Sequence, residues 1–399
     1  MDELTLQELL LRRERFIGLM SGRFPRWNSA VIMESVNKYY FTGTIQDGVL
    51  LILRDGSLIY GVRRSLERAL AESPLPRGEI ISIGTYRDLA QIQGGNLGEV
   101  YIEGDTMPVI TRDRLAKYFN MDSVGFLDSA VRTVRSVKSP YELNAIRQSA
   151  KAHRKLLEEN VPALLREGMT EHEFLGELSR EMYRLGYQGI ARFHQFQIDI
   201  SIGQVGFGTN ALVPTWFDGP GGCRGNGPWS PYSGDPERKL KRGEPVFVDT
   251  AFGMMGYHSD KTQVYYYGEE PPQDFLNAHS FCIGIQKRLA EMLKPGEIPS
   301  KIYETVMASI PPERQDCFMG VSPGHRVKFL GHGVGLNIDE FPVIAKGFDE
   351  PLEENMVIAL EPKYAVSGTG MAGVEDTYLV TRQGGECLTG GGRDIIVVA

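Results

Sequence analysis

The sequence predicts an α/β (α+β) protein of two domains, and three observations support this. The chain has 399 residues, which is more than the roughly 250–300 residues that one hydrophobic core usually supports. Residues 1–132 alternate short apolar strands with helical segments. Residues 140–399 begin with helices and continue with strand-like runs that have acidic residues at their ends. Such mixed orders of strands and helices are typical of α/β and α+β domains.

The first domain is predicted to open with a helix and to continue as a mixed sheet. The first 16 residues have the apolar spacing of an amphipathic helix, and they start acidic, unlike a signal peptide. Asp55-Gly56 is a typical turn between two paired strands, and residues 65–72 predict a further helix. Strands are expected at residues 29–34, 48–56, 57–62, 79–84 and 98–104.

The second domain is predicted to start with capped helices. Ser139-Pro140 places an N-cap before a proline at the first helical position, and the Thr170 segment TEHE resembles a capping box. Residues 201–243 form a Gly- and Pro-rich stretch that is too long for a plain connector, which favours a lid or a binding loop. Helices are expected at residues 140–160, 170–186, 272–294 and 300–309.

Composition argues against several classes of protein. The net charge of −8 and the lack of a basic run exclude a nucleic-acid partner. No stretch approaches the 18 or so apolar residues that span a membrane. Four cysteines occur without a CxxC pair, which argues against a zinc finger or a disulfide framework. We therefore expect a cytoplasmic enzyme whose partner is a small peptide or another small molecule.

Four carboxylates and one histidine stand at the ends of apolar runs in the second domain. Two like charges about 4 Å apart repel by roughly 4 kcal/mol at an effective dielectric constant near 20. A cluster of four carboxylates is therefore protonated, spread apart or bound to cations. The five candidate metal ligands are Asp249, Asp260, His332, Glu361 and Glu375.

Each of these residues taken alone is more often structural than functional. An aspartate at a strand end commonly caps backbone groups, and a lone histidine is commonly satisfied by the protein around it. The spacing of Asp249 and Asp260, with Gly253 and Gly256 between them, instead predicts a hairpin that brings both carboxylates to one end of a sheet. Carboxylates with one imidazole suit Mn²⁺, Co²⁺, Zn²⁺ or Fe²⁺. Two such ions would offset the four negative charges.

The five motifs that hold these residues occur in an order that resembles the pita-bread metallopeptidases, which include methionine aminopeptidase, prolidase, aminopeptidase P and the related creatinase. The motifs are VFVD, YHSDKTQ, GHGVGL, ALEPKY and GVEDTYLVT. The segments NKYYFTG (37–43) and RSVKSPYELNAIRQSA (135–150) resemble the creatinase-type domain that precedes the catalytic domain in prolidase and aminopeptidase P.

This resemblance implies a creatinase-like N-terminal domain, a pita-bread catalytic domain and a homodimer. It implies that Asp249 holds one ion, that Asp260 and Glu375 bridge two ions, and that His332 and Glu361 hold the other. It also implies that Glu361 takes the proton of the attacking water.

The chain lacks the further histidines that position substrate in the Xaa-Pro-cleaving relatives. Asp339 and Lys328 stand where two of them are expected, and the segment NALVPTWFDGPGG offers none. His258 shares a strand face with Asp260 and is a candidate catalytic group. Asp339 is a candidate general base or a site for a cationic group, and equally a residue that orients His332 or a backbone amide.

Aromatic residues gather in the long loop. Trp216 and Tyr232, with Phe217 and Trp229, either form a substrate-binding wall for a cation or pack the loop internally.

Three functions are compatible with these features. The first is a dinuclear metallohydrolase of the Xaa-Pro aminopeptidase or dipeptidase type, in which a metal-bridged hydroxide attacks an amide C–N bond. The second keeps the fold and the metals but acts as a C–N hydrolase or lyase on a small cationic substrate. The third is a binding protein without catalysis, which the five intact ligands disfavour because buried carboxylates without cations are costly.

Overall fold

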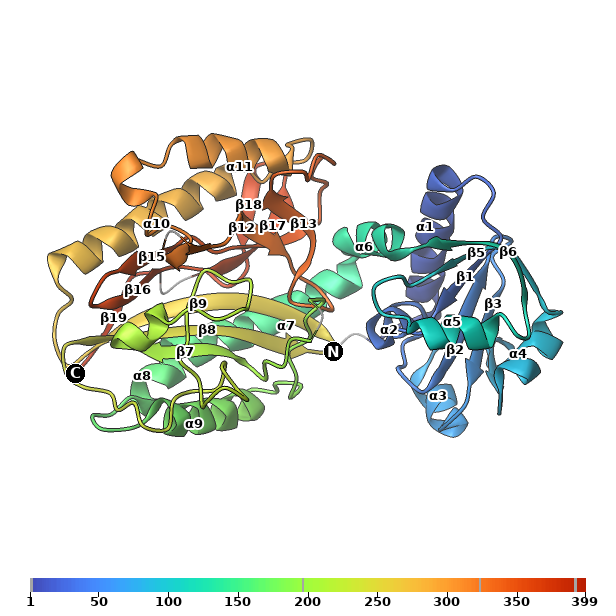
Figure 1. Ribbon diagram of the computed structural model, residues 1–399, viewed down its shortest axis with the longest axis horizontal. Coiled ribbons are helices and arrows are strands. Elements are labelled where there is room, and N and C mark those ends of the chain that lie inside the picture. The colour runs from blue at the N-terminus through green and yellow to red at the C-terminus, as the bar shows by residue number, and fades with distance from the viewer. Residues whose placement is uncertain (1–2, 196, 323, 391–392) are drawn as a thin grey trace. The chain divides into compact units, whose positions relative to one another are not determined.

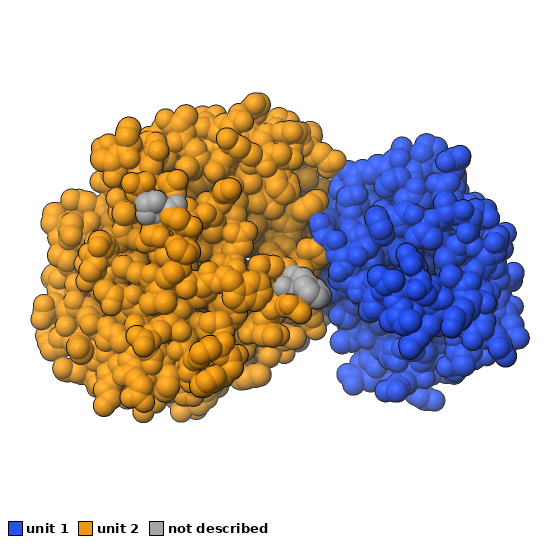
Figure 2. Space-filling model, viewed as in Figure 1, with its two compact units in different colours: residues 1–135 blue, residues 136–399 orange. Residues whose placement is uncertain are grey.

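The computed structural model describes residues 3–195, 197–322, 324–390 and 393–399. The chain divides into two compact units, Met1–Arg135 and Ser136–Ala399 (Figure 2). Both units combine sheets with helices, so the predicted α/β fold class is confirmed.

The first unit is built on a six-stranded mixed sheet with the order β4-β3-β2-β1-β5-β6. β2 and β3 pair as an antiparallel hairpin on either side of the predicted Asp55-Gly56 turn, where Gly56 has a φ of +92°. The strands are β1 (Ser29–Ile32), β2 (Gly48–Leu53), β3 (Leu58–Val62), β4 (Ile80–Ser82), β5 (Asn96–Ile102) and β6 (Asn120–Phe126).

Helices flank this sheet and bury its apolar side chains. The opening helix forms as predicted, with Thr5 as its N-cap, and α3 matches the helix expected at residues 65–72. The sequence did not predict α2, α4, α5 or α6. The helices are α1 (Leu6–Arg23), α2 (Ser35–Thr42), α3 (Leu66–Glu72), α4 (Tyr86–Gln93), α5 (Val109–Leu115) and α6 (Asp128–Ser136).

The second unit places a mixed four-stranded sheet, in which β19 runs parallel to β9, against an antiparallel five-stranded sheet. A four-stranded sheet has the order β19-β9-β8-β7, and a five-stranded sheet has the order β13-β12-β14-β17-β18. The strands that matter for the site are β7 (Gly203–Phe207), β8 (Glu244–Met254), β9 (Tyr257–Tyr267), β12 (Phe329–Gly333), β13 (Glu340–Ala345), β14 (Val357–Leu360), β15 (Lys363–Val366), β16 (Gly370–Gly373) and β17 (Asp376–Thr381). The others are β10 (Gly320–Ser322), β11 (His325–Arg326), β18 (Gly384–Cys387) and β19 (Ile396–Val398).

Helices cover both outer faces of this pair of sheets (Figure 1). α7, α8 and α9 pack on one face of β8 and β9 around Val246, Val248 and Tyr265. α10 packs on the other face, where Phe247 and Val264 contact β15 and β16. The helices are α7 (Pro140–Lys155), α8 (Val161–Leu164), α9 (Glu171–Arg184), α10 (Gln273–Met292) and α11 (Pro299–Ala308).

The predicted helix starts of this unit are confirmed. The Ser139 and Thr170 hydroxyls each accept a hydrogen bond from the backbone amide of the third residue of their helix. The side chains of Glu142 and Glu173 accept one from the amide of the cap residue, so both caps are complete capping boxes. None of the described helices is both long and apolar enough to cross a bilayer.

The long polar stretch is less irregular than predicted. Its first residues form β7, an edge strand in which Gln204 lies opposite Asp249 of β8. The strand was missed because Gly203 and Gly206 interrupt its apolar pattern. A 3₁₀ turn follows at Gly208–Leu212, so the irregular part of the stretch covers residues 213–243.

Two threonines join the four-stranded sheet to the five-stranded one. The Thr377 hydroxyl accepts from the Asp260 amide at 2.8 Å and donates to the Asp260 carbonyl at 2.9 Å. The Thr262 amide donates to the Glu375 carbonyl at 3.2 Å. These bonds hold β9 beside β17, and they place Asp260 next to Glu375.

Candidate metal centre

The structure brings all five predicted metal ligands to one place between the two sheets. Asp249 and Asp260 come from the β8–β9 hairpin, in which Asp249 pairs with Thr262 and Ala251 pairs with Asp260. His332 lies on β12, Glu361 directly follows β14, and Glu375 directly precedes β17. Because β14 pairs with both β12 and β17, the five-stranded sheet delivers three ligands to the same edge.

Three carboxylate oxygens lie within 4.0 Å of the imidazole nitrogen Nε2 of His332, and Asp260, Glu375 and His332 together form a group that can hold one ion. His332 Nε2 lies 3.3 Å from Glu361 Oε1, 3.8 Å from Asp260 Oδ2 and 4.0 Å from Glu375 Oε1. Its Nδ1 lies 3.1 Å from the Gly333 carbonyl, to which it donates, so Nε2 faces the carboxylates. Two atoms that coordinate one ion at about 2.0–2.2 Å lie roughly 3–4.3 Å apart. This group, here called the histidine side, therefore fits one divalent ion.

The protonation of the histidine side also indicates a cation site. Burial lowers the pKa of His332, but the hydrogen bond and charge of Glu361, with Asp260 and Glu375 behind it, outweigh burial and raise it to about 10. Burial and the charges of Glu375 and Asp249 raise the pKa of Asp260 well above its ordinary value. Without an ion, His332 and Asp260 therefore hold protons, because the clustered carboxylates favour positive charge at this place.

A lysine occupies the opposite side of the same carboxylates. Lys363 Nζ lies 2.8 Å from Asp249 Oδ2, 2.8 Å from Glu375 Oε2 and 3.1 Å from Glu361 Oε2. Its side chain is fully buried, and Nζ stands 5.7 Å from the centre of the Phe247 ring. Burial lowers the pKa of Lys363, but the three carboxylates outweigh it and raise the pKa well above its ordinary value. This group, here called the lysine side, was not predicted from the sequence.

Asp249 has both of its carboxylate oxygens engaged on the lysine side. Oδ2 accepts from Lys363, and Oδ1 lies 2.9 Å from the Thr262 hydroxyl. The same hydroxyl lies 2.9 Å from Glu375 Oε2 and, having one proton, donates to one of the two oxygens at a time. Burial raises the pKa of Asp249 to about 6, although the charge of Lys363 works against this.

His258, a predicted catalytic group, has both ring nitrogens bonded to protein groups outside the ligand set. Nδ1 lies 3.1 Å from the Gly335 carbonyl, to which it donates. Nε2 lies 3.3 Å from the Arg192 amide and 3.1 Å from the Gln188 side-chain nitrogen, so it is the acceptor. Burial lowers the pKa of His258 to about 4, which keeps the ring neutral. The ring fixes the loop that follows His332.

Asp339 contacts backbone groups of a neighbouring segment. Its carboxylate accepts hydrogen bonds from the amides of His194 and, at 3.0 Å, Gln195. Burial raises the pKa of Asp339, while these amides and the charge of His332 lower it. His194 was overlooked in the sequence because it lies outside every motif. Lys328, at the other position where a histidine was expected, is exposed.

Trp216, Phe217 and Tyr232 of the predicted aromatic residues belong to one cluster, whereas Trp229 is 81% exposed. Trp216 and Tyr232 have ring centres 6.3 Å apart, and Phe217 links Tyr232 to Phe193 through contacts of 6.0 and 5.6 Å. Trp216 is 57% exposed, whereas Tyr232 is 6% exposed. Asp218 follows Phe217, and partial burial with the negative charge of Glu361 raises its pKa. The loop therefore carries an exposed acidic side chain next to its aromatic cluster.

The glycines around His332 permit close contact between strands. A Cβ on Gly331 would lie 2.2 Å from the Ala359 carbonyl, and one on Gly333 would lie 2.2 Å from the Phe341 carbonyl. A side chain at either position would push β12 away from its neighbours.

We expect Gly331→Ala to weaken metal binding by about 10- to 100-fold, the range seen when groups that orient a ligand are lost. The methyl group displaces β12 from β14 and moves His332 relative to Glu361. Titration calorimetry with Mn²⁺ measures the change. Gly284→Ala is the matched control, because Gly284 lies exposed in α10 with nothing within 4 Å of the added Cβ. Wild-type affinity in Gly331→Ala would contradict the expectation.

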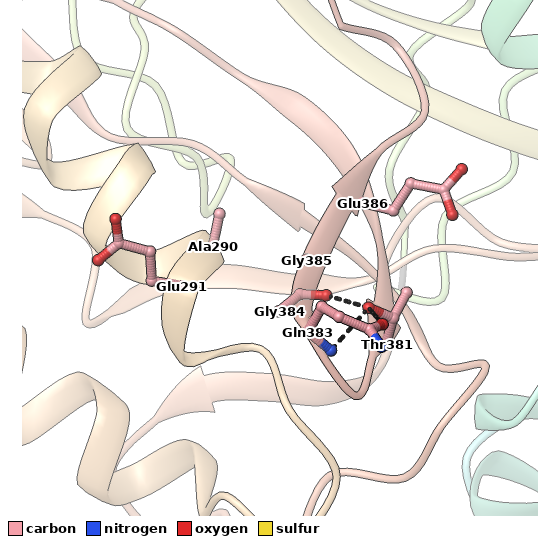
Figure 3. Close-up of a pocket in the computed structure, with 7 residues that line it drawn as sticks. All are labelled: Ala290, Glu291, Thr381, Gln383, Gly384, Gly385 and Glu386. Atoms are coloured by element: carbon pink, nitrogen blue, oxygen red, sulfur yellow. Dashed lines mark hydrogen bonds between the residues drawn. The ribbon is translucent and has the colours of Figure 1, made fainter.

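A surface hollow lies apart from the predicted site residues. Figure 3 shows it between the end of α10 and the β17–β18 hairpin. Its lining consists of Ala290, Glu291, Thr381, Gln383, Gly384, Gly385 and Glu386. None of these is a predicted ligand or substrate-binding residue.

Two family models match the sequence. The model of metallopeptidase family M24 matches residues 144–382, and the model of the creatinase/prolidase N-terminal domain matches residues 12–137. An uncharacterized peptidase of Staphylococcus aureus (strain MRSA252) is 27% identical over 367 residues, which are 91% of this chain and 94% of that protein.

Solved structures share the fold of the whole chain. An X-Pro aminopeptidase from Thermotoga maritima and a prolidase from Pyrococcus horikoshii each match with a TM-score of 0.77 and 22% identity, over 97% of this chain and 100% of theirs. The dipeptidase PepE from Mycobacterium ulcerans matches with a TM-score of 0.78 and 22% identity, over 100% of both chains. The predicted creatinase-like N-terminal domain and pita-bread C-terminal domain are thereby confirmed.

Proposed function

The chain belongs to metallopeptidase family M24, and from this premise we propose that it hydrolyses small peptides by a metal-dependent Xaa-Pro aminopeptidase or dipeptidase reaction. The observation that carries the proposal is the histidine side, where ligand atoms of Asp260, His332 and Glu375 lie close enough together for a divalent ion and Glu361 Oε1 stands 3.3 Å from His332 Nε2. Such an ion supplies a Lewis acid that polarises the peptide carbonyl and lowers the pKa of water.

The residues of the centre have different roles in the proposed reaction. Asp260, His332 and Glu375 would hold the ion. Glu361, whose side chain is 5% exposed, turns Oε1 to the same side, where it is placed to accept a proton from the attacking water. His258 and Asp339 act in this proposal as positioning groups, because their polar atoms hold the loop after His332 and the segment at His194.

The loop of residues 213–243 supplies the proposed substrate-binding surface. Asp218 carries a carboxylate close enough to Glu361 to sense its charge, and its side chain is accessible to solvent. A free amino terminus is the cationic group that a small peptide offers to such a carboxylate. Trp216 and Tyr232 would pack against the adjoining side chain of the peptide.

A second candidate is C–N hydrolysis or elimination on a small cationic molecule. The acidic and aromatic groups of this loop favour it, because they fit a cation whether or not a peptide bond follows. The products distinguish the two candidates: a peptidase releases free amino acids, whereas a lyase releases an unsaturated product.

Several sequence-based expectations stay predictions within this proposal. They are the presence of two ions, the identity of the metal among Mn²⁺, Co²⁺, Zn²⁺ and Fe²⁺, the homodimer and the cytoplasmic location. The reaction proposed here requires one bound ion.

Removal of divalent metal is expected to abolish turnover, and its return is expected to restore it. The purified protein is stripped with a chelator, loaded with Mn²⁺, Co²⁺ or Zn²⁺, and offered Xaa-Pro and Xaa-Ala dipeptides, tripeptides and small cationic amides. Mass spectrometry follows the products. Full activity in the stripped protein would refute metal dependence. Cleavage of cationic amides without cleavage of any peptide would favour the second candidate.

A further inference from the structure

We propose that the Lys363 ammonium group takes the place of a second metal ion, so that the centre binds one divalent ion per chain. This inference rests on the metal dependence of the proposed function and is independent of its substrate. It goes against the two ions that the sequence predicts.

The oxygens of the two glutamates divide between the two sides of the centre. Glu361 and Glu375 each turn Oε1 towards His332, and each turns Oε2 towards Lys363. The lysine side thus gathers three carboxylate oxygens within 2.8–3.1 Å of one cationic nitrogen. A second ion would need these same oxygens, and it would have to stand where Nζ stands.

Asp249 supports the same division. This carboxylate lies on the lysine side, where its two oxygens accept hydrogen bonds from Lys363 and Thr262. The other four predicted ligands supply the atoms of the histidine side. The histidine side can therefore hold an ion without Asp249. On the lysine side, the ammonium group of Lys363 occupies the position that a second ion would take.

The ammonium group is held firmly in this position. Lys363 pairs with Gly373 across β15 and β16, and its carbonyl accepts from the Met319 amide at 2.9 Å. Its side chain is fully buried with the Phe247 ring beside Nζ. Moving Nζ aside would break three hydrogen bonds between the buried ammonium group and carboxylates, and such charge-assisted bonds are about twice as strong as neutral ones.

Charge balance is also met by one ion. The four carboxylates carry four negative charges, and lysine is cationic at neutral pH. With His332 neutral as a ligand, one divalent ion and Lys363 offset three of these charges. The one that remains is available to a cationic substrate group.

The first experiment counts ions in the wild-type protein. After saturation with Mn²⁺ and removal of excess metal, elemental analysis is expected to give one ion per chain, and the electron paramagnetic resonance spectrum is expected to be that of an isolated ion. Two ions per chain with a spin-coupled spectrum would overturn the proposal, and so would the absence of bound metal.

The second experiment compares metal binding by variants of the lysine side with metal binding by a variant of the histidine side. Lys363→Ala removes the ammonium group, leaves three free oxygens and is expected to bind two ions per chain. Asp249→Asn is expected to keep one ion with affinity lowered by about tenfold or less, whereas Asp260→Asn is expected to lose at least about 100-fold. Equal losses in the two aspartate variants would overturn the proposal, as would a folded Lys363→Ala that still binds one ion. The aspartate comparison decides the matter if Lys363→Ala does not fold.

These measurements separate the inference from the proposed function. If one ion binds and no peptide is cleaved, the inference stands and the peptidase assignment falls. If two ions bind and peptides are cleaved, the inference falls and the assignment stands.

Discussion

Replacement of Asp260 by alanine is expected to remove the bound ion and to lower kcat/KM by about 10³-fold or more. Asp260 Oδ2 lies 3.8 Å from His332 Nε2 and belongs to the group that fits an ion. Without the Asp260 carboxylate, an ion bound by Glu361, Glu375 and His332 has no ligand from β9. A Lewis acid contributes several kcal/mol to the transition state, and about 4 kcal/mol corresponds to a factor of about 10³ in rate.

The measurement pairs metal content with kinetics on the best substrate of the peptide panel. Glu270→Ala is the matched control, because Glu270 is an exposed acid just beyond the end of the same strand. It is expected to keep wild-type metal content and activity. An Asp260→Ala protein that turns over substrate like the control would remove Asp260 from the catalytic site, and with it the centre as described.

Much of this site follows from strand periodicity and spacing. Asp249 and Asp260 could be placed together because eleven residues containing Gly253 and Gly256 suit a hairpin, and β8 and β9 pair accordingly. The convergence of His332, Glu361 and Glu375 required more, because β12, β14 and β17 are separated in sequence and meet only through the sheet order. That convergence was expected from the family resemblance, since no local pattern specifies which strands pair.

Lys363 could have been found by the rule that placed His258. Alternate residues of a strand share a face, so Lys363, two residues after Glu361, is expected on the ligand side, and it lies there. The same rule was less informative for His258, whose ring bonds to Gly335 and Arg192 in the surrounding loops. Strand periodicity predicts on which face of a strand a side chain lies. It does not predict the hydrogen-bond partners of a side chain near a strand end, because loops supply those partners. His194 illustrates this limit, because only the fold brings it beside Asp339.

Lys261→Met is expected to destabilise the second unit by about 3–5 kcal/mol, the usual cost of removing one partner from a buried ion pair. Lys261 Nζ lies 2.8 Å from Asp376 Oδ1, and both side chains are 1% exposed. The two residues follow Asp260 and Glu375 in sequence, so the pair joins β9 to β17 behind the metal centre. Without Lys261 the Asp376 carboxylate stays buried, and it keeps its contacts with the Thr389 hydroxyl and the Arg393 guanidinium.

Urea unfolding gives the change in midpoint, and hydrogen exchange of residues 257–267 shows whether the loss is local to β9. Lys301→Met removes an exposed lysine from the Lys301–Glu304 pair of α11, where the lysine side chain is 71% exposed, and is expected to change stability by less than about 0.5 kcal/mol. The double variant Lys261→Met/Asp376→Leu removes the stranded charge as well, so it is expected to recover much of the loss. If Lys261→Met were as stable as Lys301→Met, the pair would not be what holds β9 against β17. The bonds of Thr262 and Thr377 alone would then align Asp260 with Glu375.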